Sequence, residues 1–71
     1  MAVHNRLKSI RHQHEMNQTE FAKLLGINHD QYNRYERNNR QPKLEIAIKI
    51  SERLGVTVND IFYLVDKQSA P

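Results

Sequence analysis

The segment from His29 to Arg37 is unusually rich in side chains that can donate or accept hydrogen bonds. On a helical wheel at about 100° per residue, Tyr32 and Tyr35 fall on one side and can pack inward. The other side carries five polar residues, namely His29, Asp30, Asn33, Arg34 and Arg37. This division predicts a helix with an apolar inner side and a hydrogen-bonding outer side.

The outer side chains match the edges of DNA bases in the major groove. Arg34 can bind guanine O6 and N7, and Asn33 can bind adenine N6 and N7, each through two hydrogen bonds. Asp30 can accept a hydrogen bond from cytosine N4 or can cap the start of the helix, and we favour the cap. A solvated polar surface is the simpler alternative for this side of the helix. The surrounding residues are therefore needed to distinguish it from a surface that contacts DNA.

The residues before this segment indicate a tight turn between two short helices. Asn17 and Asn28 are suitable N-caps for the two helices, and Gly26 suits the left-handed conformation that ends the first one. Ile27 can fill the core beneath the turn. These features predict a helix-turn-helix, in which the second helix projects into the major groove.

Basic residues gather in the same part of the chain. Residues 1–43 contain eight Lys and Arg against four Asp and Glu, whereas residues 44–71 contain three against four. This imbalance favours a polyanion as the partner, although a charge of +3 also serves solubility. The predicted phosphate contacts are Gln18, at the start of a helix, and the basic residues Arg37, Arg40 and Lys43.

Glu36 lies at the border of the apolar side of its predicted helix, and Arg11 holds the same position on the first helix. A carboxylate in that position without a partner would be costly. We therefore predict a structural Arg11–Glu36 ion pair, which would also keep Glu36 from repelling phosphates.

Apolar residues recur at helical spacing throughout, so we predict an all-α fold: a compact bundle of five short helices in a single domain of residues 1–65, with a polar tail at 66–71. The helices are expected at about Val3 to His14, from Asn17 to Gly26, from Asn28 to about Arg37, from Pro42 to Gly55, and from Thr57 or Asn59 to about Leu64.

The fourth predicted helix is apolar over about 200° of its wheel, whereas a surface helix needs little more than about 100°. The fifth helix and the tail can cover the excess, or it can form part of a dimer interface. Because one small domain buries too little surface for strong sequence-specific binding, we expect a homodimer. The candidate interface residues are Ile46, Tyr63, Leu64 and Val65.

Taken together, these residues resemble the Cro and lambda-repressor type of helix-turn-helix regulator, also called the Xre family. The resemblance rests on the stretches Asn5–Arg11, Asn17–Asn28, Tyr35–Arg37, Gln41–Pro42, Ile50–Val56 and Asn59–Phe62. It implies a five-helix lambda-repressor-like domain that regulates transcription, in most members as a homodimer on a palindromic double-stranded DNA operator. It also implies base readout by His29, Asp30, Asn33 and Arg34, and a phosphate contact by Gln18.

Four positions depart from the family pattern, and one of them is Asp30, which is acidic on the side expected to face DNA. Asn38 stands where many members have glycine, and asparagine tolerates the left-handed conformation. Tyr32 and Tyr35 replace the usual aliphatic residues beneath the recognition helix, so that one of their hydroxyls can reach the surface near DNA.

Other classes of function fit the sequence less well. We find no nucleophile with a base and an orienting group, and His12 and His14 are two positions apart, so they cannot share a metal on one helix. We therefore expect no enzyme, cofactor or metal. The absence of cysteine, signal peptide and membrane span favours a cytoplasmic protein. The main alternative is an antitoxin or another module that binds a protein partner through the same fold.

Overall fold

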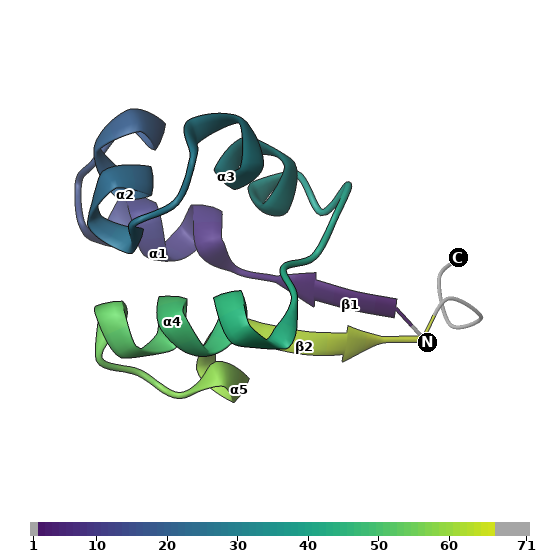
Figure 1. Ribbon diagram of the computed structural model, residues 1–71. Helices are drawn as coiled ribbons and strands as arrows, with labels where there is room; N and C mark the ends of the chain where they lie inside the picture. The colour runs from purple at the N-terminus through teal and green to yellow at the C-terminus, as the bar shows by residue number, and fades with distance from the viewer. Residues whose placement is uncertain (1, 67–71) are drawn as a thin grey trace.

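A computed structural model describes residues 2–66, which form five helices and a two-stranded antiparallel sheet (Figure 1). In chain order the elements are β1 (Ala2–Asn5), α1 (Leu7–Gln13), α2 (Gln18–Leu25), α3 (His29–Glu36), α4 (Leu44–Leu54), α5 (Val58–Ile61) and β2 (Phe62–Val65). The prediction of a purely all-α fold is therefore wrong, although the five helices are present. Of the predicted tail at 66–71, residues 67–71 lie outside the described part.

The two strands replace parts of two predicted helices. Ala2 pairs with Val65, and Asn5 pairs with Phe62, so the first helix starts later and the fifth ends earlier than expected. The residues of β2 are aromatic, β-branched or leucine, which suits a pleated half-buried surface. Because the pairing joins the two ends of the domain, the local periodicity of either segment does not reveal it.

The predicted caps of α2 and α3 are confirmed. The Asn17 side chain accepts a hydrogen bond from the Glu20 backbone N–H at 2.8 Å, and the Glu20 carboxylate accepts one from the Asn17 N–H at 3.0 Å. Asn28 caps α3 by accepting from the Asp30 N–H at 2.7 Å, so Asn28 supplies the cap that we favoured for Asp30. Asn38 adopts a left-handed φ of 60°, as its residue type permits.

The core lies between α2 and α3 on one side and α4 and α5 on the other (Figure 1). The rings of Phe21 and Tyr32 pack edge to face with centroids 5.6 Å apart. The buried core residues are Leu7, Phe21, Ala22, Leu25, Tyr32, Tyr35, Ile50 and Ile61. Since α3 contributes both of its tyrosines to this core, its opposite side faces outward.

The wide apolar arc of α4 is divided between the core and the surface. Ile50 and Ala47 are buried, and Ile46 packs partly against the core. Leu44 is 72% exposed and Ile48 is 43% exposed. The domain therefore covers most of the arc itself and leaves the remainder open.

Candidate nucleic-acid interface

The turn between α2 and α3 fixes the direction in which α3 projects. Gly26 ends α2 with a left-handed φ of 72°, and Ile27 packs partly against the core. Lys49 of α4 donates a hydrogen bond from Nζ to the Gly26 carbonyl at 3.0 Å. Sequence reasoning did not single out Lys49, although the exposed carbonyls at a helix end attract cations.

The outer surface of α3 consists of hydrogen-bonding side chains. His29, Asp30 and Arg34 are exposed, and Asn33 is half-buried at the side nearest α2. An α-helix with its side chains is about 10–12 Å across, so α3 can enter the major groove, which is about 12 Å wide. Gln31 is also exposed on α3 and lines a groove with Arg34, and our wheel omitted it because it lies at the edge of the polar arc.

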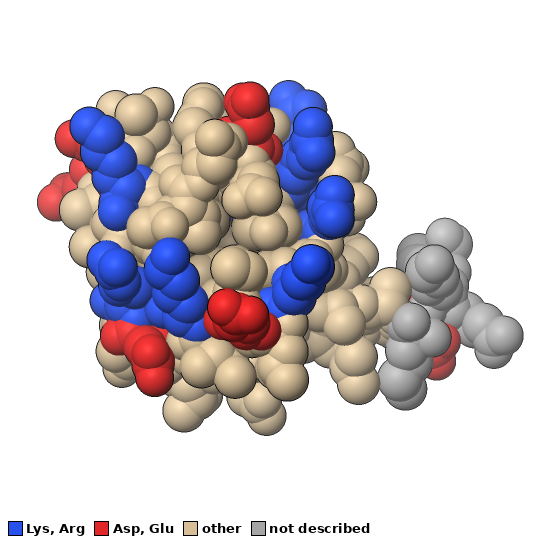
Figure 2. Space-filling view, viewed as in Figure 1, with Lys and Arg blue, Asp and Glu red and all other residues tan. Residues whose placement is uncertain are grey.

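Four exposed cations, Arg34, Arg37, Arg40 and Lys43, border this surface, and we call them the cationic rim. Within residues 2–66, none of the four side chains makes a hydrogen bond or ion pair. In Figure 2, Lys and Arg side chains follow the face from α3 toward the start of α4. Such a rim attracts a polyanion and keeps its donors available for it.

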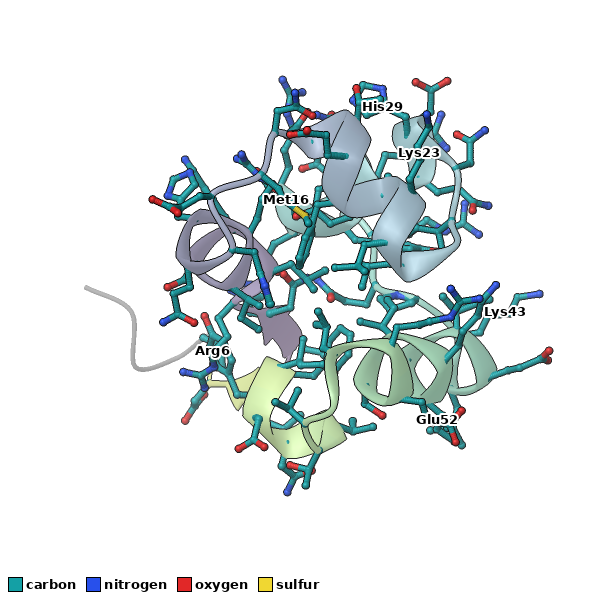
Figure 3. All side chains as sticks on the ribbon, turned by 90° about the vertical axis from the view of Figure 1, so that its left-hand side faces the viewer. Arg6, Met16, Lys23, His29, Lys43 and Glu52 are labelled. Carbon is teal, nitrogen blue, oxygen red and sulfur yellow. The ribbon has the colours of Figure 1, made fainter. Side chains whose placement is uncertain are left out.

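The rim borders an open groove between α3 and the start of α4. Its lining includes Gln31, Arg34 and Tyr35 from α3, Arg40 and Lys43 from the following segment, and Ile46 from α4. Figure 3 shows Lys43 and Arg6 on opposite sides of the domain. Arg6 instead lies over the Tyr63 ring, 4.6 Å from its centre. The basic residues before α4 therefore do not all belong to one surface.

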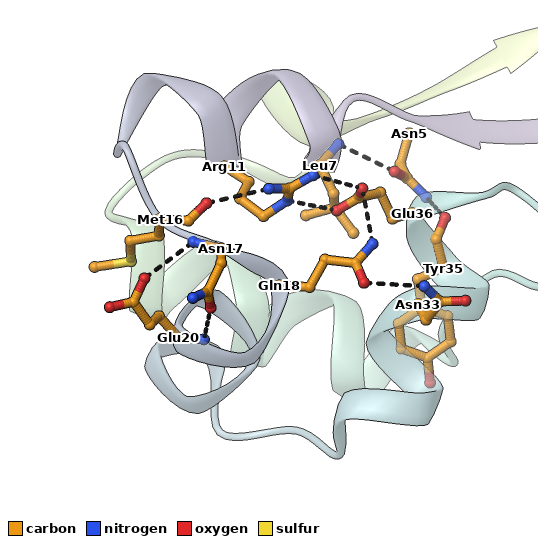
Figure 4. A network of polar contacts seen from close by, with 10 residues as sticks. All are labelled: Asn5, Leu7, Arg11, Met16, Asn17, Gln18, Glu20, Asn33, Tyr35 and Glu36. Atoms are coloured by element: carbon orange, nitrogen blue, oxygen red, sulfur yellow. Dashed lines mark hydrogen bonds and ion pairs between the residues drawn. The ribbon is translucent and has the colours of Figure 1, made fainter.

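Arg11 and Glu36 meet beneath α3 (Figure 4). Arg11 donates from Nε to Glu36 Oε2 at 2.9 Å and from Nη2 to Oε1 at 3.0 Å. The two side chains are 13% and 5% exposed, respectively. Removal of either partner would leave a largely buried charge without compensation.

The surroundings of Glu36 keep it ionised. Burial opposes the charged form, but the hydrogen bonds from Arg11 and Gln18, together with the nearby Tyr32 hydroxyl, outweigh it and lower the pKa of Glu36 to about 2. The Tyr32 hydroxyl is buried without a hydrogen bond of good geometry in residues 2–66, yet it lies close enough to Glu36 to contribute. Burial, and then the nearby carboxylate, raise the pKa of Tyr32, so its hydroxyl stays protonated.

Gln18, the first residue of α2, bridges Glu36 and Asn33, which lie three residues apart on α3. Its Nε2 donates to Glu36 Oε1 at 3.2 Å, and its Oε1 accepts from Asn33 Nδ2 at 3.0 Å. Sequence reasoning placed Gln18 at the start of α2 but missed both contacts, because they depend on the angle between α2 and α3. We call Arg11, Glu36, Gln18 and Asn33 together the polar network.

The four candidate dimer residues do not form one exposed patch. Ile46 lines the groove beside α3 and is half-buried. Leu64 and Tyr63 of β2 are 65% and 38% exposed, whereas Val65 is half-buried. Val3, which pairs with Leu64 across the sheet, is 41% exposed. The exposed apolar side chains of the sheet therefore lie on both strands.

Two classes of site can be examined directly. Among residues 2–66, no three His, Cys, Asp or Glu side chains lie close enough together to hold a metal ion. The helices in this part of the chain are also too short and too polar to cross a membrane.

The fold and this surface define a DNA-binding helix-turn-helix protein, and comparison with known proteins agrees. The helix-turn-helix family model matches residues 7–61. The chain is 34% identical over 64 residues to an uncharacterized HTH-type transcriptional regulator of Methanocaldococcus jannaschii, covering 90% of this chain and 97% of that protein. This chain therefore belongs to the helix-turn-helix family of DNA-binding transcriptional regulators, as the Cro-type resemblance predicted.

A second relative is a phage protein. The chain is 28% identical over 57 residues to the cryptic phage CTXphi transcriptional repressor RstR of Vibrio cholerae. The match covers 80% of this chain and 51% of RstR, so the chain spans about half the length of that repressor.

Proposed function

We propose that this protein is a sequence-specific repressor that inserts α3 into the major groove of a palindromic operator. The observation that carries the proposal is the outer surface of α3, where hydrogen-bonding side chains lie between the cationic rim and the start of α2. His29, Asp30, Asn33 and Arg34 read base edges. Gln18, Arg37, Arg40 and Lys43 contact phosphates. The similarity to a phage repressor supports repression as the mode of regulation. The proposed DNA target supports a cytoplasmic location.

We further propose that the protein binds as a homodimer. A single domain of this size covers one half-site, and specific protein–DNA interfaces bury roughly 1,000–2,500 Å² of protein surface. The exposed Leu64 and its partner across the sheet, Val3, supply apolar surface on one face of the sheet, and the exposed Tyr63 lies on the opposite face. We place the centre of the interface on β2, because Ile46 is already partly covered by its own domain.

Selection from a random duplex library tests sequence-specific binding, and the mass of the protein in solution is measured alongside. We expect enrichment of a palindromic motif whose half-sites are centred about 34 Å apart, one helical turn of DNA. Failure of the folded protein to enrich any motif would refute the proposal. The alternative of a protein-binding module would then gain weight.

A pair of variants tests the proposed dimer. Leu64→Asp places a charge in the proposed interface, so sedimentation is expected to show a monomer. Leu44→Asp is the matched control, because Leu44 is equally apolar and 72% exposed but lies on α4. Loss of the dimer in Leu44→Asp but not in Leu64→Asp would move the interface to α4.

A further inference from the structure

Hydrogen-bond donation within the polar network converges on the Glu36 carboxylate. Asn33 donates to Gln18, and Gln18 donates to Glu36 (Figure 4). Arg11 donates to the same carboxylate from the other side. The hydrogen bonds between members of the network therefore all lead to Glu36, and a third Arg11 donor, Nη1, binds the Met16 carbonyl outside the network at 3.1 Å.

The chemistry of Glu36 determines this direction. An ionised carboxylate can only accept hydrogen bonds, and the pKa of Glu36, at about 2, leaves no proton to donate at neutral pH. Gln18 must therefore turn its NH₂ group toward Glu36 and its carbonyl toward Asn33. Asn33 must in turn direct its own NH₂ group at Gln18, because the reversed amide would bring two oxygens together.

One consequence is that Asn33 reaches the DNA side of α3 with its amide already oriented. One N–H is used by Gln18, so the Oδ1 acceptor and the second N–H remain for another partner. The major-groove edge of adenine offers the N6 donor beside the N7 acceptor. An unrestrained amide would present its donor and acceptor in either order, whereas the network permits one.

We propose that Glu36 and Gln18 are positioning residues that orient the amide of Asn33 for adenine, so that the network helps to determine operator specificity. This inference rests on the proposed binding of α3 to base edges. It also separates two roles of Gln18, because a phosphate contact strengthens binding to every sequence whereas orientation of Asn33 strengthens binding to one.

Three variants distinguish these two roles of Gln18. The affinity of each variant is measured for the selected operator and for the same duplex in which the A·T pair assigned to Asn33 is replaced. Asn33→Ala is expected to lower the preference for the adenine by roughly 5- to 150-fold. Gln18→Met retains the length of the side chain but removes the hydrogen bonds to Glu36 and Asn33. It is expected to lose most of the preference for adenine that Asn33→Ala loses. The double variant Gln18→Met/Asn33→Ala is expected to lose no more of the preference for adenine than Asn33→Ala alone. Lys43→Met is the control and is expected to weaken both duplexes alike.

The outcome for Gln18→Met decides the specificity claim. If this variant weakens both duplexes by the same factor, Gln18 only contacts phosphate and the inference is wrong. If instead the wild type enriches no motif at all, the proposed function fails.

Side-chain amide NMR of the free protein tests the orientation of Asn33 without DNA. We expect the Asn33 amide proton donated to Gln18 to exchange slowly with water in the wild type and in Lys43→Met, and quickly in Gln18→Met. Rapid exchange in the wild type would overturn the inference even if DNA binding is specific.

Discussion

The polar network and the cationic rim both include residues of α3 but are held in opposite ways. Asn33 and Gln18 are half-buried and hydrogen-bonded to each other, and Glu36 is 5% exposed. The side chains of the rim, such as Arg40 and Lys43, are exposed and make no such bonds within residues 2–66. A side chain that is already ordered loses little entropy on binding, so the network suits base readout. Free cations act at longer range and suit attraction of the phosphate backbone.

The largest expected effect comes from breaking the network at its buried end. Glu36→Ala leaves the Arg11 guanidinium largely buried without its partner, and such losses typically cost about 3–5 kcal/mol. Urea denaturation measures the change in the free energy of unfolding. Glu45→Ala is the control, since Glu45 is exposed and its loss is expected to change stability by less than about 0.5 kcal/mol. Equal effects of the two variants would contradict the structural role of the ion pair.

The same carboxylate predicts a dependence of stability on pH. Because the pKa of Glu36 is lowered from 4.5 to about 2 in the folded protein, the unfolded chain binds its proton first as the pH falls. The stabilisation is therefore present above about 4.5 and disappears between about 4.5 and about 2. Unfolding free energies of the wild type and Glu36→Gln, measured across this range, are expected to converge at low pH. A difference that stays constant with pH would show that the pKa of Glu36 is not lowered in the folded protein.

A smaller effect is expected from the rim residue that we assign to a base. Arg34→Ala is expected to weaken operator binding by about 1–3 kcal/mol and to relax the preference at one base pair. Fluorescence anisotropy with the operator and a random duplex measures both quantities. Equal losses on the two duplexes would move Arg34 to the phosphate contacts.

The smallest effect is expected from the Tyr32 hydroxyl. Tyr32→Phe removes a buried polar atom that makes no well-formed hydrogen bond, so the lost interaction with Glu36 is offset by a lower desolvation cost. We expect thermal and urea unfolding to change by less than about 1 kcal/mol. A loss comparable to that of Glu36→Ala would place the hydroxyl inside the polar network.

Sequence reasoning succeeded where the signal is local. The caps Asn17 and Asn28 and the terminator Gly26 each act within one helical turn, and they located α2 and α3. The strands were missed because Val3 pairs with Leu64 across the whole domain, and no short window contains both residues.

The candidate site divides in the same way. A helical wheel was sufficient to bring Arg11 and Glu36 to the same border of the core, and the structure places them 2.9 Å apart. The wheel did not predict that Gln18 would join Glu36 to Asn33, because α2 and α3 must be packed against each other before these side chains meet.

Salt titration of DNA binding tests most directly whether the polar network reads bases while the cationic rim attracts phosphates. Affinities of the wild type, Asn33→Ala and Lys43→Met are measured on the selected operator and on a random duplex from low to high salt. Lys43→Met is expected to reduce the slope of log affinity against log salt by about 1 on both duplexes and to leave their affinity ratio unchanged. Asn33→Ala is expected to keep the slope and lower the ratio. A changed salt slope in Asn33→Ala, or a changed affinity ratio in Lys43→Met, would contradict the assignment of base readout to the network and of phosphate attraction to the rim.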